Sequence, residues 1–182
     1  MSTSSTPTTP KLRGYGAHIL YLDFDGVLHP EDVWRKPGVG IYLGPGGDGH
    51  QLFENLPLLE EALAPYPWVQ IVLSTTWVRV LRFSKAKAHL TQHLQSRVVG
   101  GTFHTGMDDA AYLDLPRGQQ VERDAARRKP AEWVAVDDAR EGWSNEATTR
   151  VVLTDPIEGI RHPEVFVRLQ SMLAAKFSHS PR

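Results

Sequence analysis

The sequence predicts an α/β fold with a mainly parallel central sheet, arranged as a three-layer sandwich. Short apolar runs rich in strand-forming residues alternate along the chain with segments of helical periodicity. Several of these apolar runs end directly in acidic or hydroxyl residues. Because ligands bind beyond the carboxyl ends of the strands in such sheets, we expect the functional residues to lie there.

Five apolar runs are the candidate strands of this sheet. Each is short, nearly continuously apolar and bounded by polar residues or glycine, as buried parallel strands are. The first run ends at Asp23 and Asp25, the second at Ser74, and the fourth at Asp137 and Asp138. The expected strands cover residues 19–24, 69–73, 97–99, 133–136 and 150–153.

Four helical segments follow or separate these runs. Leu56, Leu59 and Leu63 share one face of the first segment, which Pro65 ends. The last segment begins at Pro163 and carries apolar residues at spacings of three and four. The two middle segments are highly charged. The expected helices lie near residues 54–65, 79–95, 117–128 and 163–177.

The chain of 182 residues is expected to form a single domain over residues 15–177, since domains commonly have about 100–200 residues. Residues 1–14, which begin with a Ser/Thr/Pro-rich stretch, predict a disordered tail, and residues 178–182 predict a frayed end. Residues 29–54 hold three prolines and a glycine-rich run. This insertion predicts a long, flap-like loop over the strand ends.

Composition narrows the classes of function. The net charge of −1 gives no overall indication of nucleic-acid or membrane binding. The lack of cysteine excludes disulfides and thiolate metal sites, and it favours a cytoplasmic protein. No apolar run reaches the roughly 20 residues of a membrane span, and the first ten residues lack the apolar core of a secretory signal. We therefore expect no membrane partner.

Asp23 and Asp25, at the end of the first run, are the main indication of a functional site. Burying unpaired charge is costly, and carboxylates this close repel each other. A divalent cation such as Mg²⁺, which prefers oxygen ligands, is the natural counter-charge. The pair therefore predicts a metal-dependent carboxylate site, although Asp followed by Gly26 also occurs in ordinary turns.

Four separated motifs, taken in their order along the chain, resemble those of the haloacid dehalogenase (HAD) superfamily of phosphohydrolases. The resemblance spans roughly residues 19–160 and implies a Rossmann-like, HAD-like core. The matching residues are Asp23-Phe-Asp25-Gly26-Val-Leu28 for the first motif, Ser74 for the second and Asp137-Asp138 for the fourth. The third motif is a lone Lys or Arg, for which Arg117 is the candidate and four further cations compete. The competing residues are Arg123, Arg127, Arg128 and Lys129.

The resemblance implies a role for each residue. Asp23 would attack phosphorus and form an aspartyl-phosphate, while Asp25 would act as general acid and then general base. Ser74 and Arg117 would contact the phosphoryl oxygens. The metal site for Mg²⁺ would consist of Asp23, the backbone carbonyl of Asp25, Asp137 and Asp138. The remaining substrate-binding candidates are Gly26, Thr75 and Trp77.

Two features have alternative interpretations. Trp77 either stacks on a base or sugar of the substrate or packs against the wall of the site. The cations between residues 79 and 97 form either a rim for a polyphosphate or nucleic-acid backbone, or a solvated helix face.

The insertions at 29–54 and 78–116 are too short for a full cap domain. A capless site is suited to a bulky phosphoester, or to closure by a second copy in a homo-oligomer.

Three functions remain open. The first is an Mg²⁺-dependent phosphomonoester hydrolase acting on a phosphorylated small molecule or a nucleic-acid end. The second is a nucleic-acid end phosphatase, because segments 69–77 and 133–138 resemble small HAD phosphatase domains associated with RNA repair. The third is a binding or regulatory module that keeps the fold and metal site without turnover.

Overall fold

The computed structural model of the chain describes residues 11–104, 106–107 and 109–180. The first ten residues of the predicted tail and residues 181–182 lie outside this range. The rest of the predicted tail is bonded to the domain: the Leu12 carbonyl accepts a hydrogen bond of 3.0 Å from the Tyr15 amide, and the Arg13 carbonyl accepts one from the Arg128 guanidinium.

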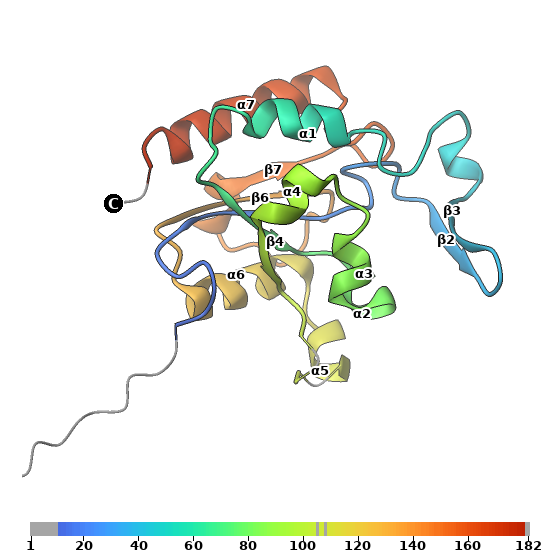
Figure 1. Ribbon diagram of the computed structural model, residues 1–182, viewed down its shortest axis with the longest axis horizontal. Helices are drawn as coiled ribbons and strands as arrows, with labels where there is room; N and C mark the ends of the chain where they lie inside the picture. Colours follow the sequence, from blue (N-terminus) through green and yellow to red (C-terminus); the bar gives the residue numbers. More distant parts are fainter. Residues whose placement is uncertain (1–10, 105, 108, 181–182) are drawn as a thin grey trace, which may run out of the picture.

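A sheet of five parallel strands forms the centre of the molecule, in the spatial order β5-β4-β1-β6-β7 (Figure 1). The first strand lies in the middle, so the strands on its two sides must be reached by crossover connections. The five predicted strands all form, which confirms the α/β class. The strands are β1 (His18–Leu22), β4 (Gln70–Leu73), β5 (Val98–Gly101), β6 (Glu132–Asp137) and β7 (Val151–Leu153).

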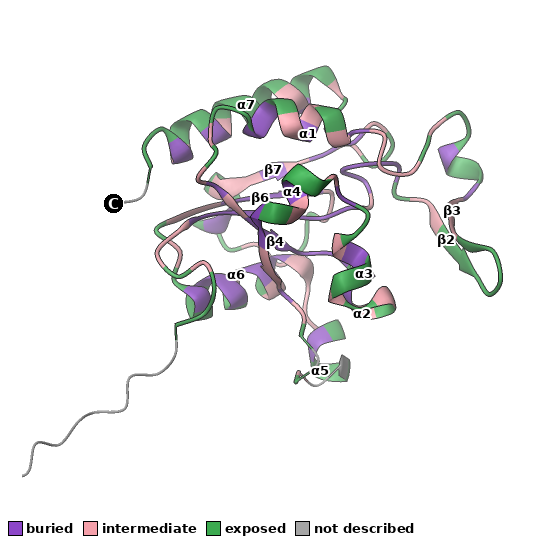
Figure 2. Cartoon of the chain, in the orientation of Figure 1, coloured by how far each residue is buried: buried purple, intermediate pink, exposed green. Residues whose placement is uncertain are grey.

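Alternate residues of the central strand face opposite layers. Leu20 and Leu22 belong to a large apolar cluster, whereas Ile19 and Tyr21 belong to a smaller one on the other face. Helices α1 (Leu56–Leu63) and α7 (Pro163–Phe177) cover the first face, and α6 (Arg117–Arg128) covers the second (Figure 1). Figure 2 shows the buried strands between helices whose outer sides are exposed. The predicted three-layer sandwich is thereby confirmed.

The single basic helix predicted near residues 79–95 is wrong. Three short helices replace it: α2 (Trp77–Leu81), α3 (Phe83–Lys87) and α4 (Gln92–Arg97). Arg82 separates the first two because its φ of +72° is incompatible with a right-handed helix. Thr91 begins α4 as its N-cap, where the hydroxyl accepts a hydrogen bond from the Leu94 amide. Charge alone gave no indication of these breaks.

The insertion at residues 29–54, predicted as a loop, contains an antiparallel hairpin of β2 (Val33–Lys36) and β3 (Gly40–Leu43) and a short 3-10 helix, η1 (Pro45–Gly47). Figure 1 shows this hairpin projecting from one end of the molecule. Asp32 closes its base, since its carbonyl accepts a 2.7 Å hydrogen bond from the Gly44 amide and its Oδ2 accepts one of 2.8 Å from the Gly46 amide.

Two further short elements complete the fold. Helix α5 (Asp109–Leu113) lies in the segment between β5 and α6, and the 3-10 helix η2 (Ala147–Arg150) precedes β7. Within the described residues, no helix has the length and apolar character that crossing a membrane requires. The core has no added cap domain in the described part of the chain.

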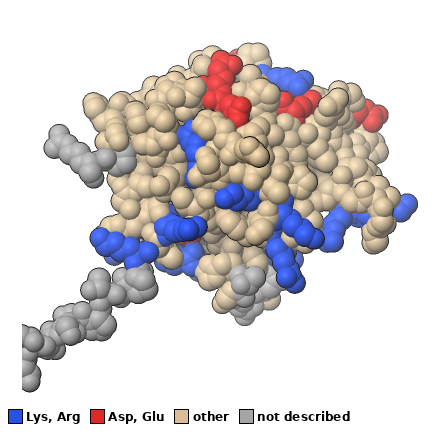
Figure 3. All heavy atoms as spheres, viewed as in Figure 1, with Lys and Arg blue, Asp and Glu red and all other residues tan. Residues whose placement is uncertain are grey.

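Charge is unevenly distributed on the face seen in Figure 3. Most of the Lys and Arg side chains visible there lie across its lower half, where Figure 1 places α2, α3, α5 and α6, whereas acidic side chains gather near the top. Although the net charge of the chain is −1, this side of the domain has a basic region.

Candidate active site

The strand register brings three of the predicted residues to one level. Leu22 of β1 pairs with Leu73 of β4 on one side and with Val136 of β6 on the other. The next residue of each strand is therefore Asp23, Ser74 or Asp137, and all three are at most 3 % exposed. The carboxyl ends of neighbouring strands thus place two carboxylates and a hydroxyl side by side.

Asp23, Asp137 and Asp138 form a carboxylate cluster. One oxygen of each lies within 4.8 Å of the others. Oδ2 of Asp137 is buried without a hydrogen-bond partner in the described part of the chain. Three convergent carboxylate oxygens are suitable ligands for a hard divalent cation such as Mg²⁺, which takes few protein ligands and fills its remaining positions with water. The residues therefore fit the predicted metal.

Burial and mutual repulsion raise the pKa of each of these three carboxyl groups. For Asp23 burial is the main cause, opposed by Arg117 and reinforced by Asp25. For Asp137 burial again dominates, followed by the charge of Asp23. Burial and then Asp23 raise the pKa of Asp138 to about 7. The cluster consequently favours protonation unless a cation compensates its charge.

Arg117, the first residue of α6, supplies positive charge to this cluster. Its Nη2 lies 3.2 Å from Asp23 Oδ2 and its Nε lies 3.4 Å from Asp137 Oδ2. Burial alone would lower the pKa of Arg117, but the two carboxylates raise it, so the side chain stays cationic. Gly118 lets the start of α6 approach closely, because a Cβ there would lie 2.4 Å from the backbone of Gly142.

The other candidate cations lie away from the cluster. Arg127 and Arg128 bind Asp124, at 2.7 and 2.8 Å. Arg123 and Lys129 are exposed, and Lys129 adopts a left-handed conformation at the end of α6. Of the five cations considered from the sequence, Arg117 is the one in contact with Asp23 among the described contacts.

The hydroxyl groups after β4 lie beside Asp23. Ser74 Oγ is buried and has no hydrogen-bond partner among the described residues. A buried hydroxyl usually has a partner, so this atom is available to a ligand oxygen. The neighbouring Thr75 side chain hydrogen-bonds to Asp23 and lowers its pKa, an effect smaller than that of burial.

Asp25 is held apart from the carboxylate cluster by two donors. Trp77 Nε1 donates to Asp25 Oδ1 at 2.8 Å. The Phe53 amide donates to Nδ1 of His29, so the proton of a neutral His29 ring is on Nε2, which lies 3.1 Å from the same oxygen. The predicted metal contact of Asp25 is through its backbone carbonyl and stays a prediction.

The environment of Trp77 favours packing over stacking on a substrate. Its side chain is 3 % exposed, and its ring lies edge-on to Phe24, Phe53 and His89 at centroid distances between 5.0 and 5.8 Å. No ring face of the indole is therefore open to a base, and its polar N–H is directed to Asp25.

Gly26 permits a close approach between the first and fourth motifs. Its φ is +66°, and a Cβ there would lie 2.3 Å from Asp138 Oδ2. The Gly26 carbonyl accepts a 2.6 Å hydrogen bond from the Thr154 hydroxyl, which follows β7. Gly26 thus permits the positive φ of the turn and leaves the space that the Asp138 side chain occupies.

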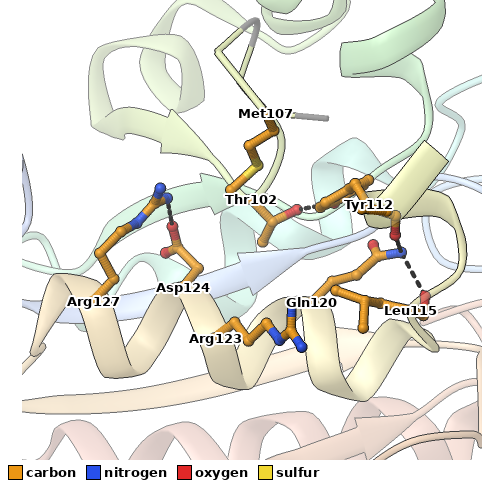
Figure 4. Close-up of a pocket in the computed structure, with 9 residues that line it drawn as sticks. Thr102, Met107, Tyr112, Leu115, Gln120, Arg123, Asp124 and Arg127 are labelled. Atoms are coloured by element: carbon orange, nitrogen blue, oxygen red, sulfur yellow. Dashed lines mark hydrogen bonds and ion pairs between the residues drawn. The ribbon is translucent and has the colours of Figure 1, made fainter. Parts of the chain in front are cut away.

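Sequence reasoning missed three residues near the cluster or its loops. Glu31 raises the pKa of Asp138, and Asn55 ties the Asp25 loop through a 3.1 Å bond to the Val27 carbonyl. Tyr112 interacts electrostatically with both Asp23 and Arg117. Its hydroxyl bonds Thr102 Oγ1 at 2.7 Å beside a pocket of about 270 Å³ (Figure 4). No sequence motif marks these positions.

The comparisons with known proteins agree with this geometry. Residues 19–165, most of the 182-residue chain, match the family model described as "HAD domain in Swiss Army Knife RNA repair proteins". Neither the curated proteins nor the solved structures gave a match. The matched range includes all four motifs and the whole parallel sheet except His18, the first residue of β1. The chain therefore belongs to the HAD superfamily of phosphohydrolases, in the family of HAD domains of Swiss Army Knife RNA repair proteins.

Proposed function

We propose that this HAD-type hydrolase is an Mg²⁺-dependent phosphomonoester hydrolase in which Asp23 is the nucleophile. The observation that carries this proposal is the position of Asp23 at the strand end. Its Oδ2 lies 3.2 Å from Arg117, while the unpartnered hydroxyl of Ser74 lies on the adjacent strand end. Phosphoryl transfer needs an in-line nucleophile surrounded by groups that stabilise negative oxygens.

The two aspartates have separate tasks in the proposed reaction. An oxygen of Asp23 attacks phosphorus, an aspartyl-phosphate forms, and the bond to the leaving oxygen breaks as Asp25 donates its proton to that oxygen. Asp25 then takes a proton from water, which attacks the acyl phosphate and releases inorganic phosphate and free Asp23. Arg117 and Ser74 stabilise the phosphoryl oxygens during both steps. Bound Mg²⁺ supplies further neutralisation of charge.

The test is hydrolysis of an aryl phosphate with Mg²⁺ by the wild type and by Asp23→Asn. We expect the variant to lose activity by at least about 1,000-fold, because an amide is a poor nucleophile. Asp48→Asn, which changes an exposed carboxylate in the insertion, is the matched control and should retain full activity. Undiminished turnover by Asp23→Asn overturns the assignment.

A phosphorylated nucleic-acid end is the substrate class that we propose. The family description names RNA repair proteins, and the described part of the core has no cap domain to exclude a polymer. Oligoribonucleotides with a 3′- or 5′-phosphate should have a higher kcat/KM than a small aryl ester, and that advantage should fall with added salt. Equal values for both substrates argue against a polymeric substrate. A non-catalytic module would instead bind Mg²⁺ but hydrolyse neither.

A further inference from the structure

A groove of about 640 Å³ lies along β5, the edge strand of the sheet. It is formed by the segment before β1, helices α2 and α3, the strand itself and the end of α6. Among the described residues, its lining includes five arginines and one histidine and no acidic residue. These lining residues are Arg13, Arg79, Arg82, Arg127, Arg128 and His104.

The charge in the groove is only partly compensated. Asp124 pairs with Arg127 and Arg128 from behind, as Figure 4 shows for Arg127. Arg13 and Arg82 are both exposed, and neither forms an ion pair with a described residue. In a chain with a net charge of −1, the exposed charges of Arg13 and Arg82 in this basic lining favour an anionic ligand.

Apolar and aromatic side chains line the groove together with these basic residues. Phe83 and Phe103 are half-buried in the lining, and Gly100 and Gly101 leave the edge strand without side chains. A Cβ at Gly100 would lie 3.3 Å from an Arg128 nitrogen, so the lack of a side chain there lets that guanidinium pack against the strand. Proteins hold single-stranded nucleic acid by combining a positively charged groove with aromatic rings, so that phosphates lie on the cations and bases stack on the rings.

The groove begins next to the active site. Gly101 pairs with Leu73, the residue before Ser74, and the Thr102 amide donates to the Leu73 carbonyl at 2.9 Å. Helix α2 connects the two regions directly: its first residue, Trp77, holds Asp25, and the next two, Val78 and Arg79, line the groove. A chain that leaves the active site along β5 would pass over these residues.

We propose that this groove binds the single-stranded nucleic acid whose phosphorylated end is hydrolysed at Asp23. The inference rests on the proposed function for the identity of the polymer, but binding to the groove is measurable without turnover. A nucleic acid fits this lining better than an acidic peptide does, because Phe83 and Phe103 add aromatic rings to the positive charge.

The test is the binding of a fluorescein-labelled single-stranded oligoribonucleotide without a terminal phosphate, measured by fluorescence anisotropy over a series of salt concentrations. The double variant Arg13→Ala/Arg82→Ala should bind at least about 10-fold more weakly at low salt. Its salt slope should be less steep by about 1.4, since each phosphate contact on a single strand contributes about 0.7. Arg168→Ala, an exposed arginine on α7 at the far side of the sheet from β5, is the control and should bind like wild type.

Phe83→Leu separates stacking from charge. It keeps most of the apolar volume and removes the ring, so binding should weaken by about 5-fold or more with an unchanged salt slope. If the double variant binds the oligoribonucleotide as tightly as Arg168→Ala does, the proposed role of the groove is wrong. Equally tight binding of an acidic peptide of matched charge, with no effect of Phe83→Leu on either ligand, overturns the assignment to nucleic acid.

Hydrolysis of the small aryl phosphate distinguishes failure of the groove from failure of the proposed function. The groove variants should hydrolyse it at the wild-type rate, because among the described ion pairs the carboxylates contact Arg117 and neither Arg13 nor Arg82. A groove variant with normal aryl phosphate hydrolysis and normal RNA binding overturns the groove alone. If the wild type does not hydrolyse the aryl phosphate, the proposed reaction is overturned. The RNA-binding result alone then decides whether the groove binds nucleic acid.

Discussion

The indole Nε1 of Trp77 donates a 2.8 Å hydrogen bond to Oδ1 of Asp25, the same oxygen that His29 reaches at 3.1 Å. Two donors on one oxygen fix the orientation of the carboxylate. In the described part of the chain no donor reaches its other oxygen, Oδ2, which leaves that oxygen for proton transfer. Trp77 and His29 are thus positioning residues for the proposed acid and base.

Trp77→Phe tests this role by removing the donor while keeping a ring among Phe24, Phe53 and His89. We expect kcat for an aryl phosphate to fall roughly 10- to 100-fold with little change in KM, because misplacing a catalytic group slows the chemical step. The free energy of unfolding should fall by only about 1 kcal/mol. Trp133→Phe, outside the site, is the control. A change in KM alone would contradict the positioning role.

Arg117→Ala removes the positive charge between Asp23 and Asp137. Leaving two buried carboxylates without their partner should destabilise the metal-free protein by about 3–5 kcal/mol, measured by urea unfolding. Activity with Mg²⁺ should fall by about 100- to 1,000-fold. Arg123→Ala, an exposed change on the same helix, should leave both quantities near wild type. Equal effects of the two changes would show that Arg117 has no special role.

Asp138 should make the stability of the metal-free protein depend on pH. Its pKa is about 7 in the folded protein against an ordinary value of 3.8, so the folded state holds the proton more tightly. Its contribution to stability is present below the ordinary value and is lost as the pH rises through about 7. Asp138→Asn should therefore gain in Tm relative to wild type as the pH rises from about 5 to about 8 in EDTA.

The control for this pH series is Asp155→Asn. Hydrogen bonds from the Glu158 and Ile157 amides lower the pKa of Asp155, so its contribution to stability is constant above its ordinary pKa. The Tm difference of this variant should stay flat over the same range. Mg²⁺ should restore the wild-type Tm at the upper pH, since it binds ionised carboxylates. Parallel pH curves for wild type and Asp138→Asn would contradict the raised pKa.

Gly26→Ala separates two effects of a side chain at this turn. The positive φ costs about 1–3 kcal/mol for a non-glycine residue, and the Cβ would also displace Asp138 from the cluster. Gly38→Ala has a similar φ of +78° with nothing within 4 Å of the Cβ, so it measures the backbone cost alone. We expect both variants to lose stability by urea unfolding, but only Gly26→Ala to lose Mg²⁺-dependent hydrolysis.

The strands could be predicted from the sequence because each is a short, mainly apolar run, and the central strand, β1, buries both of its faces. Leu20 and Leu22 pack on one layer while Ile19 and Tyr21 pack on the other, so no polar position interrupts the run. The strand-end residues followed from the same pattern, since a carboxylate directly after such a run must lie at the edge of the sheet.

The remaining features depend on contacts between distant residues. The bond from Trp77 to Asp25 joins positions 52 residues apart, and the tyrosine at position 112 reaches the cluster from a short helix with no marked periodicity. The break at Arg82 depends on a backbone conformation that no residue type at that position predicts. The hairpin in the insertion is likewise set by Asp32, whose partners lie at positions 44 and 46.

The hydrogen bonds at Asp32 hold the two ends of the hairpin together. Val33 of β2 and Ile41 of β3 pack against the core beside this closure, so the chain between them begins and ends at fixed points. Evolution or design can therefore lengthen, shorten or replace the turn between β2 and β3 while the strand register and the carboxylates stay in place. The position of the catalytic residues is thus independent of the sequence and length of the hairpin turn.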